Sequence, residues 1–384
     1  MSHSTSYIEI SRSALEQNLG FIRRECGPTV RFSSVVKGNA YGHGIRPYTE
    51  LALSLGVDHF SVFSSDEALA VKEVVQNEAE LMIMGMIGLD ELEWAIRHDV
   101  AFYVFEMKRL EKALELGRKL DISPRIHLEV DTGMNRTGFD KHELRTATEL
   151  LKANEGNYVL EGFCTHYAGA ESVANHTRVQ RQYKQYNRAY NWITKQGITP
   201  QQRHTACSAA SMTYPKTRMD MCRIGILQYG FWPSRETFIN YLAKRKDKTD
   251  PLKRLISWKS KVMSTHHVRA GDFIGYGTTY MAEDDMRIAT IPVGYSHGYS
   301  RSLSNTGRIL IGGHRVGVVG LVNMNVMIVD ITHLPDTVLE DEVVLIGKQD
   351  EMELSVASFG ELSDQLNYEL LTRLPMNIPR KIVD

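Results

Sequence analysis

The sequence contains few cysteines, and their spacing suggests neither a disulfide scaffold nor a metal centre. The four lie far apart, without a Cys-x-x-Cys pair, at Cys26, Cys164, Cys207 and Cys222. Disulfide frameworks and zinc sites need more closely patterned cysteines, whereas isolated ones are typically reduced and buried. We therefore expect a reducing compartment, no disulfide and no metal.

Long apolar runs and an excess of charge are also missing. No run approaches the roughly 20 apolar residues that span a bilayer, and the start "MSHSTSYIEI" has no basic region followed by an apolar core. Lysine plus arginine number 45 against 46 acidic residues, a formal net charge of -1. Such a balance gives no overall field for nucleic acid or an anionic membrane. These absences favour a cytoplasmic protein with a small-molecule partner.

Short apolar runs alternate with amphipathic segments through much of the 384 residues. This alternation is typical of β-α units that build a parallel sheet. Eight runs have strand character, which is the number that closes a TIM-type (β/α)8 barrel of about 250 residues. They lie at 31–36, 59–64, 81–86, 100–105, 125–130, 161–167, 201–207 and 222–230.

The pattern changes after the eighth run. Residues 242–254 are rich in charge and contain Pro251, which is typical of an exposed linker. Short β-rich runs follow, and Gly312-Gly313 suits a two-residue hairpin turn. We predict an α/β fold with a barrel domain over 12–241 and a smaller, mainly β domain over 242–384 that includes residues 1–11.

The stretch "VVKGNAYGHG" places Lys37 at the end of the first predicted barrel strand. Catalytic groups of such barrels lie where strands end at the C-terminal face. A lysine amine becomes nucleophilic when burial and nearby cations lower its pKa, and its commonest use is a Schiff base with pyridoxal phosphate. A single lysine at a strand end would otherwise be a solvated surface residue.

The same stretch resembles the cofactor-binding lysine motif of the alanine racemase family. Further segments similar to that family's motifs follow in the family's order, over residues 6 to 380. The resemblance implies a barrel followed by a β domain, pyridoxal 5'-phosphate as cofactor, and a homodimer with shared active sites that converts L-alanine to D-alanine for peptidoglycan. The segments are "EVDTGMNRTGF", "THYAGAE", "CSAAS", "RIGILQYG", "IGYGTTY", "IPVGYSHG", "VNMNVMIVDIT" and "NYELLTRLP".

The resemblance also implies catalytic roles. Lys37 would act on one face of the substrate's α-carbon, and Tyr276 of the other subunit would act on the opposite face. His166 would assist the phenol, while Arg223 would face the pyridine nitrogen and keep it unprotonated. Taken alone, Tyr276 could be a half-buried strand residue, and Arg223 could form an ion pair with Asp220.

Cofactor and substrate contacts follow from the same motifs. Arg136 would contact both cofactor and substrate carboxylate, as bidentate arginines do. Tyr368 also fits simple packing of an amphipathic helix. The implied cofactor-binding residues are Lys37, Tyr41, Arg136, Ser208, Arg223, Gly225, Ile226 and Tyr368, and the implied substrate-binding residues are Arg136, Met324 and Tyr295.

Four departures from the family pattern bear on the site. Glu129 stands where the family often has a carbamylated lysine, and we predict that its carboxylate pairs with Arg136. Cys207, Asn325 and His297 replace residues that are usual in the family. These changes leave the reaction type intact but keep a second reading open, a racemase for serine or for a broader range of amino acids.

Two other classes fit the sequence less well. A pyridoxal-phosphate-dependent amino-acid decarboxylase shares the layout but uses a cysteine of its β domain, whereas all four cysteines here precede residue 223. A non-catalytic protein that binds pyridoxal phosphate would consist of a barrel alone, which leaves residues 255–384 unexplained.

Overall fold

The computed structural model describes residues 4–356 and 367–384, without the side chains of residues 367 and 368. The chain divides into two compact units. The barrel unit comprises Ser13–Lys37 and Thr49–Arg254, and the β-rich unit comprises Met1–Arg12, Gly38–Tyr48 and Leu255–Asp384. No helix in the described part of the chain is both long and apolar enough to cross a membrane.

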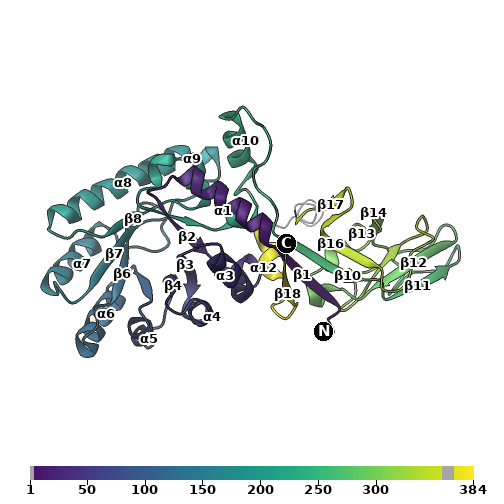
Figure 1. The fold of residues 1–384 in the computed structure, drawn as a ribbon, viewed down its shortest axis with the longest axis horizontal. Helices are drawn as coiled ribbons and strands as arrows, with labels where there is room; N and C mark the ends of the chain where they lie inside the picture. Colours follow the sequence, from purple (N-terminus) through teal and green to yellow (C-terminus); the bar gives the residue numbers. More distant parts are fainter. Residues whose placement is uncertain (1–3, 357–366) are drawn as a thin grey trace. The chain divides into compact units, whose positions relative to one another are not determined.

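Eight parallel strands form the barrel, as the sequence predicts (Figure 1). Their order is β8-β7-β6-β5-β4-β3-β2-β9, and a parallel bridge between Cys207 and Arg223 brings the end of β8 to β9. The barrel is therefore nearly closed. The strands are β2 (Arg31–Val35), β3 (His59–Ser64), β4 (Glu80–Met86), β5 (Ala101–Val104), β6 (Arg125–Glu129), β7 (Val159–Cys164), β8 (Gln202–His204) and β9 (Met221–Ile224).

Amphipathic helices cover the outside of the barrel (Figure 1). On the first, Leu15, Leu19 and Ile22 share one face and are all buried, at a gain of about 1.5–3 kcal/mol for each such side chain. The helices are α1 (Arg12–Cys26), α3 (Ile45–Ser54), α4 (Ser65–Val75), α5 (Leu92–Arg97), α6 (Met107–Leu120), α7 (Lys141–Ala153), α8 (His176–Lys195), α9 (Ser208–Thr213) and α10 (Arg235–Ala243).

The barrel strands also bury polar side chains. Barrel interiors are usually filled by branched aliphatic residues, yet His59, His127 and His204 have no exposed surface here. Ser33 and Ser61 are equally buried, and their hydroxyls lie 2.5 Å apart. Buried polar groups need partners, so these strands depend on specific hydrogen bonds as well as on apolar packing.

The β-rich unit contains two sheets. One has the order β14-β13-β16-β10-β1-β18, with β17 on β16, and the other is β11-β12-β15. Gly312 and Gly313, with φ of 55° and 74°, form the predicted hairpin turn. The elements are β1 (Ser6–Ser11), β10 (Ile256–Lys261), β11 (Ser264–Val268), β12 (Met286–Ile291), β13 (Arg308–Ile311), β14 (His314–Gly317), β15 (Met327–Asp330), β16 (Glu342–Gln349), β17 (Met352–Leu354), β18 (Arg380–Val383) and α12 (Asn367–Arg373).

Residues 242–254 are less exposed than a free linker would be. Gln17 of α1 donates to the Pro251 carbonyl at 2.8 Å, and Asn18 donates to the Lys253 carbonyl at 2.7 Å. Leu252 is buried. The second half of this stretch is thus packed on the barrel unit through backbone carbonyls. Its charged composition does not predict this contact. The predicted domain limits stay a prediction.

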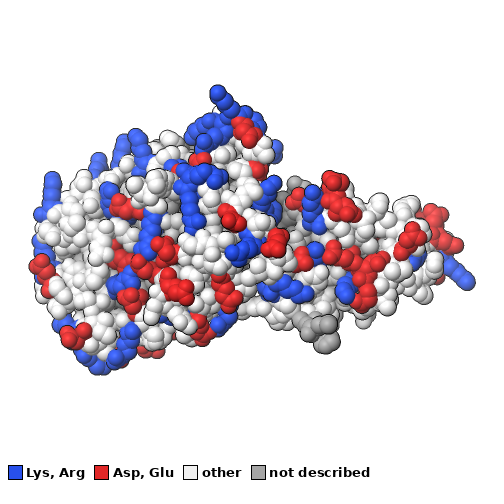
Figure 2. All heavy atoms as spheres, in the orientation of Figure 1, with Lys and Arg blue, Asp and Glu red and all other residues white. Residues whose placement is uncertain are grey.

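Charges of both signs are interspersed over the visible face of the protein (Figure 2). This distribution agrees with the balance of 45 basic against 46 acidic residues.

Candidate functional site

A group of cationic side chains gathers at the C-terminal ends of the barrel strands. Lys37 follows β2, and its pKa is lowered by burial of the amine among barrel atoms and by the positive charges of Arg136 and Arg223. Glu67 opposes this shift. The side chain of Lys37 nevertheless remains accessible to solvent. An amine in such surroundings is more often unprotonated than an ordinary lysine, as a nucleophile or a base requires.

The strand end before Lys37 is held by a polar clamp. The Val35 carbonyl accepts hydrogen bonds from Gln228 Nε2 at 2.9 Å and from the Tyr229 hydroxyl at 3.0 Å. The Ser34 hydroxyl donates to Gln228 Oε1 at 2.7 Å. The side chains of Ser34 and Gln228 are both fully buried. The clamp fixes the backbone two residues before the lysine.

The segment that follows Lys37 is a left-handed turn, α2 (Lys37–Tyr41). Gly38, Asn39, Ala40 and Tyr41 have φ between 50° and 62°. Each non-glycine residue in this conformation costs about 1–2 kcal/mol. Hydrogen bonds offset the strain: the Asn39 side chain accepts from the Ile45 amide at 2.9 Å, and Gly38 accepts from the Gly42 amide at 3.1 Å. The glycines of this loop therefore serve an unusual backbone turn.

His166 lies beyond the end of β7, in the same cationic group. Burial lowers its pKa to about 3, and the positive charges of Arg223, Arg136 and Lys37 add to that shift. The ring is therefore neutral at physiological pH. A neutral imidazole among cations can accept a proton or a hydrogen bond without adding to their mutual repulsion.

Arg223 of β9 is almost fully buried and is held by neutral acceptors. Nη1 donates to the His204 carbonyl at 2.7 Å and to His204 Nδ1, while Nη2 donates to the carbonyls of Thr165 at 2.9 Å and Thr205 at 3.2 Å. Nε makes no hydrogen bond with a described residue. The alternative ion pair with Asp220 is not formed, because Asp220 pairs with Arg203 at 3.1 Å.

Three residues predicted to bind phosphate meet at the ends of β8 and β9. Ser208 begins α9, and its hydroxyl accepts from the Gly225 amide at 2.9 Å. Ile226 begins η3 (Ile226–Tyr229) and is buried. Within the described residues, the Ile226 amide has no acceptor. A hydroxyl and backbone amides in one place suit an anion such as phosphate.

Arg136 sits on a loop that Asp131 organises. The Asp131 carboxylate accepts from the amides of Gly133 at 2.8 Å and Met134 at 2.9 Å. Our prediction that Glu129 pairs directly with Arg136 is wrong. Among the described residues no ion pair joins them, and Glu129 instead has a hydrogen bond with the Thr137 side chain. Burial raises the pKa of Glu129, and the arginine charges only moderate that rise.

The remaining predicted site residues belong to the β-rich unit. Tyr276 lies between Gly275 and Gly277, whose φ values are 75° and 70°, and its side chain is 73% exposed. It is not the half-buried strand tyrosine of the alternative reading. Tyr41 lies in the left-handed turn. Tyr368 falls in α12, but its side chain lies outside the described residues.

Tyr295 and Met324 are brought together on the β-rich unit. The Tyr295 amide donates to the Asn323 carbonyl at 3.0 Å, and the Ser296 amide donates to the Met324 carbonyl at 3.0 Å. The Met324 side chain is 55% exposed. Its own amide donates to no described residue. The amide is thus available for a ligand acceptor.

Sequence reasoning missed the residues that hold the predicted ones in place. His204 and Thr165 supply acceptors for Arg223, and Gln228 clamps the strand before Lys37. The only local signal for His204 is a histidine within an expected barrel strand. Its partner lies on another strand, so only the register of the sheet shows the contact.

A cluster at the other ends of the strands has the composition of a metal site. His59, Glu80 and Glu161 bring one ligand atom each within 4.8 Å of one another. Arginines already engage the carboxylates: Arg125 Nε lies 2.7 Å from Glu161, and Arg31 lies 2.8 Å from Glu80. These guanidinium groups oppose a further cation. The cluster is best described as an ion-pair network.

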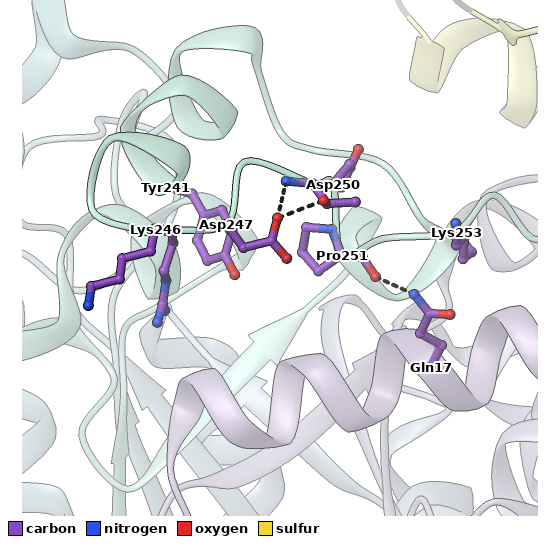
Figure 3. Close-up of a pocket in the computed structure, with 9 residues that line it drawn as sticks. Gln17, Tyr241, Lys246, Asp247, Asp250, Pro251 and Lys253 are labelled. Carbon is purple, nitrogen blue, oxygen red and sulfur yellow. Dashed lines mark hydrogen bonds between the residues drawn. The ribbon is translucent and has the colours of Figure 1, made fainter.

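A polar pocket lies elsewhere on the barrel unit, between α1, α10 and the segment after α10 (Figure 3). Its charged groups bind neighbours: Asp250 accepts from the Trp232 indole at 2.9 Å, Asp247 accepts from the Thr249 amide at 2.8 Å, and Arg245 pairs with Glu25. We assign it no chemistry. It is lined by Gln17, Tyr241, Arg245, Lys246, Asp247, Thr249, Asp250, Pro251 and Lys253.

Known proteins resemble the chain over nearly its whole length. The family models "Alanine racemase, N-terminal domain" and "Alanine racemase, C-terminal domain" match residues 10–233 and 255–382. An alanine racemase of Leptospira interrogans is 34% identical, covering 99% of this chain and 96% of that protein. One of Halothermothrix orenii is 31% identical, covering 98% and 96%.

Solved structures show the same likeness. The Bacillus anthracis alanine racemase with bound L-Ala-P has a TM-score of 0.89 at 30% identity, covering 100% of this chain and 96% of that one. The Bartonella henselae alanine racemase with covalently bound pyridoxal phosphate shares the fold, with a TM-score of 0.83 at 24% identity over 99% of this chain and 100% of that chain.

Proposed function

The chain belongs to the alanine racemase family and is a pyridoxal-phosphate-dependent racemase, and on that basis we propose that it interconverts L- and D-alanine by a two-base mechanism. The observation that carries the mechanism is the cationic group at the barrel's C-terminal face. Lys37, Arg136 and Arg223 lie close enough for their charges to act on one another, and His166 beside them is neutral.

The residues at this face suit the cofactor. Its phosphate would meet the Ser208 hydroxyl and the amides of Gly225 and Ile226, and Lys37 offers an amine whose pKa is lowered by burial and by neighbouring cations. Arg223 keeps one donor, Nε, beyond the four hydrogen bonds that fix its other nitrogens. When bound, pyridoxal phosphate supplies the electron-withdrawing ring that makes the substrate's α-hydrogen acidic.

Two groups then handle the proton. Lys37 Nζ removes or returns the α-hydrogen on one face of the carbon, and Tyr276 of the partner subunit does so on the other. Inversion results when one group takes the proton and the other supplies a new one. Phenols are ordinarily weak bases, so the phenol needs a neighbour, and neutral His166 is the group we assign to it. Arg223 would present its full positive charge to the ring nitrogen.

Arg136 and the free amide of Met324 would bind the substrate carboxylate. Tyr295, next to Met324 on the β-rich unit, would limit the room for the side chain. A small amino acid is thereby favoured, alanine first, with serine or a broader range as the second reading because Cys207, Asn325 and His297 differ from the usual residues.

We further propose a cytoplasmic homodimer that supplies D-alanine for peptidoglycan. All four cysteines are free thiols, which suits a reducing compartment. The 73% exposure of Tyr276 suits a residue that completes the site of another subunit.

Loss of optical rotation tests the reaction across a panel of L-amino acids with added pyridoxal phosphate. We expect alanine to lose rotation fastest, and Lys37→Ala to lose both the activity and the visible band that borohydride abolishes in the wild type. A panel in which a larger amino acid reacts fastest would reject alanine as the substrate.

Isotope exchange of the α-hydrogen tests the second base. Tyr276→Phe should lose exchange selectively from one enantiomer, because only one face loses its acid-base group. Tyr280→Phe, a partly buried tyrosine of the same segment, is the matched control. Small and equal losses from both enantiomers would remove Tyr276 from the catalytic pair.

A further inference from the structure

Two buried histidines continue from Arg223 along the barrel. His204 Nδ1 accepts from Arg223 Nη1, and His204 Nε2 lies 2.8 Å from His127 Nδ1. His127 Nε2 in turn lies 3.7 Å from a carboxylate oxygen of Glu161. Both histidines have no exposed surface. The line joins three strands, β9, β8 and β6, whose residues are far apart in the sequence.

The protonation of this line follows from its first member. A guanidinium has only donors, so His204 Nδ1 must be an unprotonated acceptor. Burial and the positive charge of Arg223 lower the pKa of His204 well below its usual range, so its single proton is on Nε2. That N–H donates to His127 Nδ1. The proton of His127, likewise neutral because of burial, is then on Nε2 and faces the Glu161 carboxylate.

Strand β7 lies between β6 and β8, and it has a glycine, Gly162, where the hydrogen bond between His127 and His204 passes. A β-carbon on Gly162 would lie 2.0 Å from His127 Nδ1 and 2.7 Å from His204 Nε2, inside the hydrogen bond itself. Gly162 does not have a positive φ. The lack of a side chain at Gly162 therefore leaves room for the hydrogen bond between the two rings. Strand β7 is in this way adapted to a contact between its two neighbours.

We propose that His127 is a positioning residue for the racemase site: it holds His204 in the tautomer that accepts from Arg223, so that neutral groups alone fix the guanidinium. A carboxylate in that place would orient Arg223 equally well but would offset its charge. The histidine pair orients it without that offset. The effect of His127 on catalysis rests on the proposed function. The assignment of the two histidine tautomers is independent of it.

The tautomers can be read directly from the protein. Nitrogen-15 NMR of histidine-labelled apoprotein and holoenzyme should show His204 and His127 as neutral rings with the proton on Nε2. A proton on Nδ1 of His204 would overturn the inference, even if the enzyme racemises alanine. If the tautomers are as expected but the protein does not racemise alanine, only the proposed function is rejected.

Variants at position 127 test the coupling. His127→Leu removes the acceptor and should weaken pyridoxal phosphate binding about tenfold, the ratio that one hydrogen bond of about 1.4 kcal/mol gives. His127→Asn keeps an acceptor near the Nδ1 position and should bind within about threefold of wild type. Gly162→Ala, which blocks the contact, should resemble His127→Leu and shift the nitrogen-15 signals of His204.

The control is His59→Leu, which removes an equally buried histidine of β3 whose ring nitrogen contacts Ser33 instead. His59 is close enough for its charge to act on His204, but it is hydrogen-bonded to Ser33 and not to either ring of the line, so its loss should leave the tautomer of His204 and the cofactor affinity unchanged. Equal loss of affinity in His59→Leu and His127→Leu would overturn the positioning role. If the leucine variant fails to fold, His127→Asn and the wild-type tautomers decide: an Nδ1-protonated His204 in either protein contradicts the inference.

Discussion

At the scale of single residues, the site sets protonation states by placing like charges together. Lys37, Arg136 and Arg223 repel one another, and only the lysine can give up its proton easily. Its pKa is accordingly lowered, first by burial and then by Arg136. The neutral state of His166 has the same two causes. The arginines thus favour the unprotonated amine that the proposed mechanism requires of Lys37.

Removing one of those charges should raise the pKa of Lys37. In apoprotein carrying Arg136→Gln, the pH at which an amine-selective reagent half-modifies Lys37 should increase by some tenths of a unit to about one unit, since burial remains the larger cause. Arg178→Gln is the control, because Arg178 is bound to the nearby Gly133 carbonyl. An unchanged or lowered midpoint in Arg136→Gln would contradict the electrostatic account.

Buried neutral histidines should make the protein sensitive to mild acid. Burial lowers the pKa of His59 to about 3, whereas an unfolded histidine binds a proton near pH 6.5. The unfolded state therefore takes up more protons than the folded state between these values, and the free energy of unfolding falls as the pH drops from about 6.5 toward 3. Above pH 6.5 the contribution is constant.

Urea denaturation at several pH values measures this effect. His59→Asn should flatten the slope between pH 6 and pH 4 by up to about 1.4 kcal/mol per pH unit, which corresponds to one proton. His142→Asn, at an exposed position of α7, should leave the slope as it is. A His59 variant with the wild-type slope would show that this ring does not resist protonation.

At the scale of elements, the loop after Lys37 contains a glycine, Gly42, that a neighbouring backbone crowds, and Gly156 between α7 and β7 offers a comparison. Gly42 has φ of 81°, and a β-carbon there would lie 1.9 Å from the Leu371 carbonyl oxygen. Gly156 has almost the same φ, 84°, but open space around it. The two positions separate the cost of the backbone conformation from the cost of a collision.

Alanine at each position should show that difference in the free energy of unfolding. Gly156→Ala should cost about 1 kcal/mol, the penalty of a left-handed alanine. Gly42→Ala should cost at least about 2 kcal/mol more, because backbone atoms of α12 must move. Equal losses in chemical denaturation would mean that the Leu371 backbone yields without resistance.

The helices and strands were more predictable from the sequence than the side-chain contacts between them. All eight barrel strands and the Gly312-Gly313 hairpin are present, since each depends on a local pattern of apolar and turn residues. The eighth predicted run, 222–230, is strand only as far as Ile224 and continues as η3. The bond between His127 and His204 spans 77 residues. It depends on strand register, which local patterns do not encode. The predicted Glu129–Arg136 pair failed for a related reason, because Asp131 and Thr137 determine the loop's interactions.

At the scale of the whole molecule, the β-rich unit exposes several large apolar side chains near Tyr276. Phe273 is 53% exposed, Met281 is 50% exposed, and a bridge pairs their backbones on either side of the tyrosine. Exposed apolar groups of this kind are typical of subunit interfaces. They support the proposal that Tyr276 acts in another subunit's site.

Mixing two inactive variants tests that arrangement. Lys37→Ala and Tyr276→Phe homodimers, unfolded together and refolded, should regain about a quarter of wild-type activity, because half of the dimers are mixed and each holds one intact site. Each variant refolded alone is the control. No recovery, with mixed dimers confirmed by mass spectrometry, would place both groups in one polypeptide's own site.

The position of β1 has a consequence for synthesis on the ribosome. This first strand pairs with β10 and with β18, the last strand of the chain. Strands β2 to β9 are continuous in sequence and can associate as they emerge, whereas β1 gains its first partner only when β10 has been made and its second only when β18 has been made. One edge of β1 therefore stays open for most of elongation, and the synthesis of β18 is the event that first allows that edge to be covered.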